Sequence, residues 1–339
     1  MMHPSSSGKI IPNVPHGIAP VNHNNDVIIS AVVCTYNRSH ILSSCLESLV
    51  NQSLDKNFYE IIVVNNNSVD STDDIVRDYS IKSPNIRLLH EEKQGLSHAR
   101  NRGYIEARGE YIAYLDDDAK ADKNWLANIL KAFQTVSPRP TAVGGKVSPY
   151  YLCMKADWFL DEYEVRSWGE RAHFLKPHQA QFGFSGSNMA FQKTILETFL
   201  GFSPGFGMTG GHLGLGEETE LFYRIFKKVS YFWYDPEITV EHLVPEFKMK
   251  LDYLVKRAFT GAIFVQRIRL GTKGSYSYFV TLNIAKIIFY SLMLFLTVKN
   301  PGKHWQNKFL PYISPLAGAC GSIIGLLEAK YGIELFDWK

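Results

Sequence analysis

The sequence predicts an α/β fold, in which a doubly wound and mostly parallel sheet is followed by a C-terminal helical region. Two features of the pattern indicate this. From residue 27 onward, short apolar runs alternate with amphipathic segments at the spacing of strand–helix repeats. After residue 245, long apolar stretches replace this alternation. Because 45% of the 339 residues are hydrophobic and 13% are aromatic, the chain can bury a large core.

Three sections are expected along the chain. Residues 1–26 are rich in Pro, Ser, Asn and His and lack an apolar run, so we expect a flexible tail and not a secretory signal. Residues 27–245 are expected to form the main domain, and residues 246–339 the helical appendage.

The strands and helices of the main domain follow one another regularly. Residues 27–36, "VIISAVVCTY", form a continuous apolar and β-branched run, typical of a strand covered on both faces. Residues 39–53 place their apolar side chains on one helical face, with Ser39 as the expected N-cap. The same reasoning predicts strands at 59–68, 85–91 and 110–115, and helices at 71–81, 97–107 and 123–133.

Two segments of the C-terminal region, residues 276–298 and 309–327, are near the length that crosses a bilayer. The loop between them carries Lys299, Lys303 and Lys308, so a spanning hairpin would put these lysines opposite the main domain, against the positive-inside tendency. A pair of helices lying in the membrane interface resolves this conflict. A spanning hairpin and a soluble helical pair or oligomer interface remain as alternatives.

Charge and cysteine content exclude other classes. The net charge of +3, without any block of Lys and Arg interleaved with aromatics, argues against a nucleic-acid partner. The four cysteines lack zinc-ligand spacing, so we expect reduced, buried thiols and a reducing compartment.

Polar clusters fall at the ends of three predicted strands: residues 35–38 (Thr-Tyr-Asn-Arg), 65–68 (Asn-Asn-Asn-Ser) and 116–118 (Asp-Asp-Asp). Ligands of doubly wound sheets bind outside the carboxyl ends of the strands, so these clusters should converge on one edge. Adjacent carboxylates at such an edge need a cation, and Mg²⁺ or Mn²⁺ takes oxygen ligands and bridges to phosphates. The sequence therefore predicts a metal–diphosphate site, with a solvated acidic turn as the alternative.

Five motifs occur in one order: "VVCTYNR" (32–38), "EIIVVNNNSVDST" (60–72), "GLSHARNRGYIEARGEYIAYLDDDA" (95–119), "FSGSNMAF" (184–191) and "GLGEETELFYRI" (214–225). This series resembles the family 2 glycosyltransferases of the GT-A fold, over roughly residues 27 to 245. The resemblance implies a Rossmann-like nucleotide-binding half and an acceptor half. It also implies inverting transfer of a sugar from a nucleotide diphosphate donor.

The resemblance assigns donor-side roles to particular residues. Asp118 would be the metal ligand of a "DXD" element, with Asp116 or Asp117 near the ribose. The remaining donor-side residues would line the nucleoside pocket or point toward phosphate: Thr35, Tyr36, Asn37, Arg38, Asn65, Asn67 and Arg100. The family usually has Asp at position 65. Asn65 still offers one acceptor oxygen but adds an NH₂ donor. The expectation that the donor nucleotide carries uracil therefore rests on the resemblance alone.

The resemblance also assigns acceptor-side roles. Glu218 matches the catalytic base of the "ED" element, and Glu217 is the alternative base or an acceptor-binding residue. His242 would contact the metal or phosphate. Gly186, Ser187 and Asn188 match an acceptor-side turn, Trp158 could stack on a sugar, and the glycines between 205 and 216 suggest a closing loop. Structural roles remain as alternatives. The two glutamates could be favoured by the helix dipole, His242 could be a core residue, residues 186–188 could form an ordinary turn, and Trp158 could pack in the core.

Taken together, these features lead us to expect a hexosyltransferase that uses Mn²⁺ or Mg²⁺ and a UDP-sugar, and that acts on a polysaccharide or lipid-linked acceptor. Its expected place is the cytoplasmic, inner face of a membrane, on the surface or embedded. A nucleotidyltransferase acting on sugar phosphates and a catalytically inactive nucleotide- or sugar-binding module are the alternatives.

Overall fold

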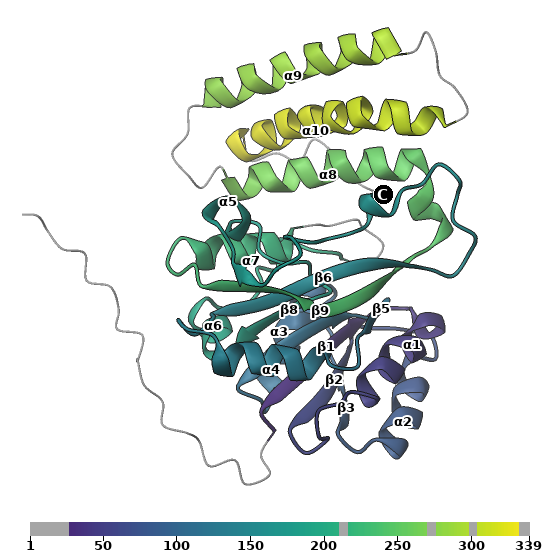
Figure 1. Cartoon of the computed structure of the whole chain (residues 1–339), viewed down its shortest axis with the longest axis vertical. Helices are drawn as coiled ribbons and strands as arrows, with labels where there is room; N and C mark the ends of the chain where they lie inside the picture. The colour runs from purple at the N-terminus through teal and green to yellow at the C-terminus, as the bar shows by residue number, and fades with distance from the viewer. Residues whose placement is uncertain (1–26, 210–215, 270–275, 298–303, 332–339) are drawn as a thin grey trace, which may run out of the picture.

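The computed structural model describes residues 27–209, 216–269, 276–297 and 304–331. The expected tail, residues 1–26, lies outside the described residues. Within them, a twisted sheet with helices on both faces makes up the lower part of the molecule in Figure 1, and three long helices are stacked above it. The expected α/β architecture with a C-terminal helical region is therefore confirmed.

Nine strands form one sheet within the described residues, in the order β3-β2-β1-β4-β8-β6-β9-β5, with β7 paired to β9. Their bounds are β1 Ile29–Thr35, β2 Tyr59–Asn65, β3 Ile86–His90, β4 Tyr111–Asp116, β5 Ala119–Ala121, β6 Ala142–Tyr151, β7 His173–Phe174, β8 Met189–Gln192 and β9 Phe232–Val244. Strands β1 to β4 pair in parallel, and β6 pairs in parallel with β9, whereas β8, β5 and β7 run antiparallel to their neighbours.

The continuous apolar runs become the buried central strands. In β1, Val33 faces one hydrophobic cluster while its neighbour Val32 faces another, because successive side chains of a strand point to opposite faces. The first cluster contains α1 and α4, and the second contains α3 and α7. Both faces of the sheet are thus covered, which explains why the strands lack the polar alternation of a half-exposed sheet.

The helices of the main domain are α1 Ser39–Val50, α2 Thr72–Lys82, α3 Leu96–Glu106, α4 Trp125–Thr135, α5 Pro177–Ala180, α6 Lys193–Thr198 and α7 Glu217–Phe226, with a 3₁₀ turn η1 at Asp161–Tyr163. Four of them, α1 to α4, lie at the predicted positions, and α5, α6 and α7 were not predicted as separate elements. The expected N-cap role of Ser39 is wrong, because Ser39 is the first helical residue. Its backbone N–H donates to the Asp70 carboxylate, 2.9 Å away, so a neighbouring loop supplies the cap.

The C-terminal region begins with the 3₁₀ turn η2, Glu246–Met249, directly after β9. It continues as α8 Leu251–Arg269, α9 Tyr276–Thr297 and α10 Trp305–Tyr331. Helix α8 lies against the main domain, α10 lies on α8, and α9 is outermost (Figure 1). The helices therefore form a layered stack on one side of the sheet.

Helices α8 and α10 approach each other closely through glycine. A Cβ on Gly321 would lie 2.2 Å from the carbonyl oxygen of Phe259, and one on Gly325 would lie 2.6 Å from that of Ile263. This G-x-x-x-G spacing puts two backbone-to-backbone contacts on one face of α10. The same interface contains an ion pair between Arg267 and the buried Glu328, 2.8 Å apart. Helix α10 is thus fixed to α8 by both packing and charge.

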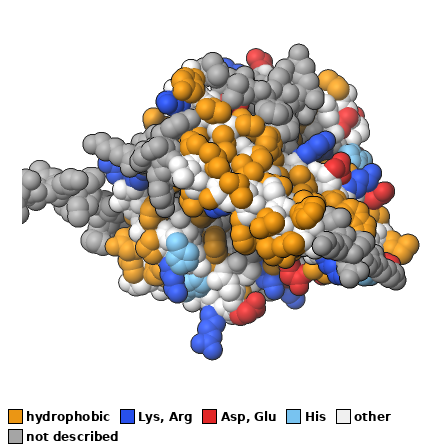
Figure 2. Space-filling view, turned by 90° about the horizontal axis from the view of Figure 1, so that it is seen from above, with side chains coloured by type: hydrophobic (Ala, Val, Ile, Leu, Met, Phe, Trp, Pro, Cys, Tyr) orange, Lys and Arg blue, Asp and Glu red, His pale blue; other side chains and the backbone are white. Residues whose placement is uncertain are grey.

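Helix α9 leaves an apolar face uncovered. Its exposed large side chains include Ile288, Phe289, Leu292, Phe295 and Leu296. Figure 2, viewed from the α9 side of the molecule, shows hydrophobic side chains gathered over this surface. By length and composition, Phe279–Thr297 and Trp305–Glu328 are the two described helices that could cross a membrane.

Candidate active site

The three polar clusters do meet at one edge of the sheet. The parallel register aligns Thr35 at the end of β1 with Asn65 at the end of β2, and aligns Cys34 with Asp116 at the end of β4. Convergence follows from the topology, because parallel neighbours end at the same side of a sheet.

The loops after β1 and β2 are joined by side-chain hydrogen bonds. The Asn37 carbonyl oxygen accepts from the Val69 N–H at 2.8 Å, and the Ser68 hydroxyl oxygen accepts from the Asn37 N–H at 2.9 Å. Asn37 and Asn67 both have positive φ angles, 52° and 66°, a conformation that Asn tolerates better than most residues. Tyr36 is half-buried beside them. The predicted nucleoside-binding loops are therefore ordered by contacts with each other.

Asn65 is buried, and its amide orientation is defined by two partners. Its carbonyl oxygen accepts from the Ser68 N–H at 2.8 Å, and its NH₂ donates to Asp73 at 2.6 Å. Asp73 in turn contacts His90 Nε2 at 2.9 Å. These bonds leave one amide N–H and one carbonyl lone pair of Asn65 for a ligand. The partnership with Asp73 was not predicted, because nothing local in the sequence links residues 65 and 73.

An acidic cluster forms beside this edge. One ligand atom from each of Asp116, Asp118 and His242 lies within 4.8 Å of the others. His242 comes from β9, whose register places it opposite Ala119 on β5, and its Nε2 is 3.1 Å from Asp118 Oδ1. Burial raises the pKa of Asp118, but His242, Lys248 and Arg38 outweigh it, so that pKa is held below its usual range.

Two carboxylates and an imidazole suit a divalent transition metal, since imidazole nitrogen and carboxylate oxygen are both ligands of Mn²⁺. Mg²⁺ prefers an all-oxygen shell, so the histidine is the ligand that distinguishes this group from an ordinary Mg²⁺ site. The structure groups Asp116 with the candidate metal ligands, whereas the sequence placed it near the nucleotide.

Asp117 is buried and bonded to Arg38, with Nη1 to Oδ1 at 2.9 Å, and the same nitrogen lies 3.2 Å from Asp118. Burial raises the pKa of Asp117 to about 7, although the Arg38 charge opposes this rise. Lys248, on η2, places its Nζ 3.9 Å from Asp118 Oδ2. Lys248 was missed by the sequence analysis, because only the fold of β9 and η2 brings it to the acidic cluster.

Arg100 links the acidic cluster to helix α7. Its side chain is almost wholly buried, and its guanidinium donates to Asp116 at 3.0 Å and to Glu217 at 2.7 Å. Gly186 makes room for it, because a Cβ at that position would lie 2.5 Å from Arg100 Nη2. Arg100 thus binds carboxylates of the protein itself, and Gly186 is explained by the close approach of this arginine.

Helix α7 starts at Glu217, after Gly216 with a φ of 91°. Glu217 is buried in its ion pair with Arg100, whereas its neighbour Glu218 is half-buried. Burial and the nearby charge of Glu217 raise the pKa of Glu218 to about 8, with Arg100 acting in the opposite direction. A carboxylate that titrates near neutral pH is suited to accept a proton. The third carboxylate of this turn, Glu220, is bonded to Arg224.

Other predicted acceptor-side residues lie elsewhere. Asn188 is fully buried: its NH₂ donates to the carbonyls of Lys146 and Ile238, and its carbonyl oxygen accepts from the Trp125 indole at 2.9 Å. Ser187 is also fully buried, 3.0 Å from the Ser185 hydroxyl. The structure does not place these two residues on a ligand-facing surface. Gly210, Gly211 and Gly214 of the expected closing loop are outside the described residues.

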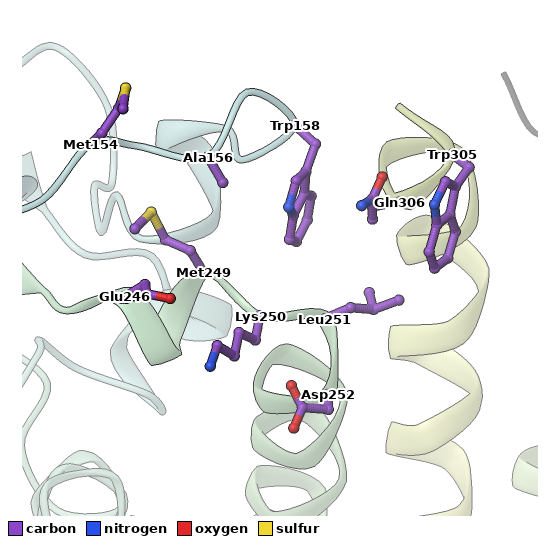
Figure 3. Close-up of a pocket in the computed structure, with 10 residues that line it drawn as sticks. All are labelled: Met154, Ala156, Trp158, Glu246, Met249, Lys250, Leu251, Asp252, Trp305 and Gln306. Carbon is purple, nitrogen blue, oxygen red and sulfur yellow. The ribbon is translucent and has the colours of Figure 1, made fainter. Parts of the chain in front are cut away.

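Trp158 lines a separate cavity of about 550 Å³, where the main domain meets α8 and α10. Figure 3 shows Trp158 along the upper edge of this cavity and Trp305, from the start of α10, at one end, with Gln306 between them. Trp305 was not predicted as a site residue, because its proximity to Trp158 depends on how α10 packs.

The chain is similar in sequence to known glycosyltransferases. The sequence model described as glycosyl transferase family 2 matches residues 30–200, about half of the chain. The chain is 25% identical over 240 residues to a glucosyl-dolichyl phosphate glucuronosyltransferase of Haloferax volcanii, covering 68% of this chain and 74% of that protein. It is 38% identical over 103 residues to the putative glycosyltransferase EpsH of Bacillus subtilis, covering 30% and 29% of the two chains.

Solved structures share the fold. A mannosyltransferase from Pyrobaculum calidifontis, in complex with GDP-Man and Mn²⁺, aligns with a TM-score of 0.60 at 18% identity, over 90% of this chain and 87% of that one. Residues 1–349 of TarS from S. aureus, in complex with UDP, align with a TM-score of 0.53 at 14% identity, over 92% and 95%. At these identities the likeness establishes the fold alone.

Proposed function

Because the chain belongs to glycosyl transferase family 2, we propose that it transfers a sugar, with inversion, from a nucleoside diphosphate donor to a hydroxyl group of a polysaccharide or lipid-linked acceptor. The observation that carries this proposal is the double ion pair of Arg100. It holds Asp116 of the acidic cluster and Glu217 of helix α7 on one guanidinium, so the acidic cluster is kept adjacent to the first turn of α7, which also carries Glu218. Transfer between two substrates needs such a fixed arrangement.

On the donor side, Asp116, Asp118 and His242 would hold Mn²⁺, which when bound supplies Lewis-acid stabilisation of the departing diphosphate. Arg38 and Lys248 lie at the same cluster and would supply positive charge to the phosphate oxygens of a bound donor. The cation would offset the excess of carboxylate at this edge, and Arg38 and Lys248 would then offset the charge of the diphosphate.

On the acceptor side, Glu218 is the proposed base. Its carboxylate takes the proton of the acceptor hydroxyl as that oxygen attacks the anomeric carbon. The bond from the anomeric carbon to the diphosphate oxygen breaks, and the nucleoside diphosphate leaves with the bonding electrons. Attack from the face opposite the leaving group inverts the anomeric centre, and no covalent enzyme intermediate is needed.

The base of the donor nucleotide is proposed to lie against Asn65 and the loops after β1 and β2. The free N–H and lone pair of Asn65 could bond to the N–H and carbonyl groups of uracil, so a UDP-sugar is our first choice. The solved relatives bind GDP-Man in one case and UDP in another, so guanine must be tested as well.

The acceptor is proposed to be presented at a membrane surface, on the cytoplasmic side. The exposed apolar face of α9 supports this, as does the name of the Haloferax relative, which refers to a dolichyl phosphate. Lys286 is exposed near the middle of α9. A lysine at the bilayer centre costs about 3 kcal/mol, whereas a helix lying in the interface leaves its charge among headgroups. We therefore favour α9 lying along the membrane over α9 crossing it.

Calorimetric titration of the full chain in lipid nanodiscs with UDP, GDP and CDP, each with and without Mn²⁺, tests the donor site. We expect one nucleotide to bind, and its affinity to depend on Mn²⁺. Asp118→Ala should abolish the dependence on metal, while Asp78→Ala, at an exposed position of α2, should not. Metal-independent binding, or no binding to folded protein, would contradict the proposal.

Product analysis separates the remaining alternatives. A glycosyltransferase releases a nucleoside diphosphate, whereas a nucleotidyltransferase releases pyrophosphate, and an inactive binding module releases neither.

A further inference from the structure

The cavity between the main domain and the C-terminal helices has the chemistry of a carbohydrate site. Two tryptophans reach it from distant parts of the chain, Trp158 from the loop after β6 and Trp305 from the first turn of α10 (Figure 3). Its volume of about 550 Å³ is within the range of small-molecule sites. An indole offers a flat apolar face against which a sugar ring can pack, and an N–H that can donate to a hydroxyl.

Polar groups around the cavity lack protein partners. Gln306 extends between the two tryptophans, and its side-chain carbonyl oxygen is buried without a hydrogen-bond partner among the described residues. Glu246, Lys250 and Asp252 also line the cavity as solvent-exposed side chains, and none of them forms an ion pair within the described part of the chain. A buried acceptor left unpaired costs about 1–3 kcal/mol unless a ligand or water satisfies it.

These groups favour a polyhydroxylated ligand over an acyl or prenyl chain. A hydrocarbon chain would leave the Gln306 oxygen unsatisfied and would bury charged side chains, both of which are unfavourable. Hydroxyl groups can donate to Gln306 and to the carboxylates and can accept from Lys250. Because two carboxylates face one ammonium, the cavity disfavours an anionic sugar and favours a neutral one.

The position of the cavity relates it to the acidic cluster. Turn η2 separates the two sites. Residues three apart in a 3₁₀ turn share a face, so Glu246 and Met249 both line the cavity, whereas Lys248 points to Asp118. A sugar in the cavity would thus lie on the far side of η2 from the reacting centre.

We propose that this cavity is a remote subsite that binds a neutral sugar unit of the acceptor against the indole rings of Trp158 and Trp305, with Gln306 as the polar partner. That the bound sugar belongs to the acceptor rests on the proposed function. Sugar binding in the cavity does not depend on that function. The subsite positions the acceptor, and the chemical step takes place on the other side of η2.

The test is ¹⁹F NMR of the full chain, labelled with 5-fluorotryptophan and held in phospholipid nanodiscs. The Trp158, Trp305 and Trp233 signals are assigned by replacing each with phenylalanine. The probes are the methyl β-glycosides of glucose, galactose, mannose and N-acetylglucosamine, with methyl β-glucuronide as the anionic probe. Sorbitol serves as a polyol control that has hydroxyls but no ring.

At least one neutral glycoside should shift the Trp158 and Trp305 signals saturably, and should leave the signal of Trp233, which packs against Phe174, unchanged. Gln306→Leu should weaken that binding about fivefold to tenfold, the effect of one neutral hydrogen bond. Trp305→Ala should weaken it about tenfold or more. Thermal unfolding of each variant checks that the fold is kept.

Three results would overturn the proposal: no saturable shift with any neutral glycoside, equal shifts with sorbitol, or tighter binding of the glucuronide than of every neutral probe. The nucleotide titration is independent of these outcomes. Nucleotide binding without sugar binding would defeat the subsite alone, and sugar binding without nucleotide binding would defeat the proposed function.

Discussion

The edge of the sheet and the stack of C-terminal helices both bury charge, but they balance it differently. At the sheet edge, carboxylates outnumber basic groups: Asp116, Asp117, Asp118, Glu217 and Glu218 face Arg38, Arg100 and Lys248. Between α8 and α10, the buried Glu328 is matched by Arg267, and the outer face of α9 carries mostly apolar groups.

This difference indicates what each region is built to meet. An excess of buried carboxylate is costly unless a ligand supplies positive charge, which is the condition of a metal–diphosphate site. The charges between α8 and α10 are paired, so this interface needs no ion. The exposed apolar face of α9, in contrast, needs an apolar surface to cover it. The comparison can be tested by changing the charge balance of the first region and the polarity or packing of the second.

The largest effect is expected at Glu218. Glu218→Gln removes the proton acceptor and should lower the transfer rate about 10³-fold, while leaving nucleotide affinity within about twofold, because a base contributes to the chemical step. The measurement is the initial rate of nucleoside diphosphate release. Glu220→Gln, on the same helical turn, is the matched control and should keep most activity. Equal losses in both variants would place the base elsewhere.

Arg100 should matter most for folding. Arg100→Met leaves Glu217 buried without its partner, so the free energy of unfolding should fall by about 3 kcal/mol, measured by chemical denaturation. The double variant Arg100→Met/Glu217→Gln should regain part of this loss, because the unpaired charge is gone. If the double variant is the less stable of the two, the ion pair is not the source of the effect.

Membrane binding should depend on α9. Replacing Ile288, Leu292 and Phe295 with Gln polarises one exposed helical face and should weaken vesicle binding about a hundredfold or more in a flotation assay. Ile81→Gln/Ile105→Gln changes exposed apolar residues of the main domain and is the control. Unchanged flotation of the α9 variant would remove the membrane from the proposal.

The pH dependence of the transfer rate should follow the titration of Glu218. Because the pKa of Glu218 is raised to about 8, kcat/KM should rise about tenfold per pH unit from pH 6 until it levels off near 8. The free energy of unfolding should change with pH in the opposite direction to kcat/KM. The folded state retains the proton, so this group favours folding at low pH, and the contribution is lost as pH rises from 4.5 through about 8. Glu218→Gln should therefore be more stable than the wild type above pH 8. A flat rate between pH 6 and 8 would contradict the assignment.

The smallest effect concerns the α8–α10 contact. Gly321→Ala introduces a Cβ 2.2 Å from a backbone carbonyl and should cost about 1–2 kcal/mol of stability in thermal or denaturant unfolding. Gly318→Ala is the control, since its Cβ would have its nearest contact at 3.8 Å and alanine favours a helix. Equal effects would mean that α10 does not pack on α8 as described.

The fold was predictable because its information is local. The strand at β1 is a continuous apolar run, and the helix α1 has one apolar face, so composition and period suffice to identify them. The convergence of Thr35, Asn65 and Asp116 followed from the rule for parallel sheets. The cap of α1 was mistaken, because Asp70 reaches it from another loop.

The contacts of the site were less predictable, because they join residues distant in sequence. Arg100 was expected to point toward phosphate, but the structure pairs it with Glu217, 117 residues away. Lys248 and Trp305 carry no local motif, and their positions depend on how η2 and α10 pack. Asn188 matched an acceptor-side turn, yet its amide is used to hold Trp125 and two backbone carbonyls inside the fold.

The layered order of the C-terminal helices has a consequence for which acceptors can react. With α9 resting on a bilayer, α10 and α8 stand between the lipid and the sheet, and packed helix axes are ~8–10 Å apart. The reacting centre is then held roughly 20 Å above the membrane. Under the proposed function, an acceptor would therefore have to extend past α10 and α8 to bring its reacting hydroxyl to Glu218. The thickness of the helix stack would then limit which acceptors can reach the site from the membrane.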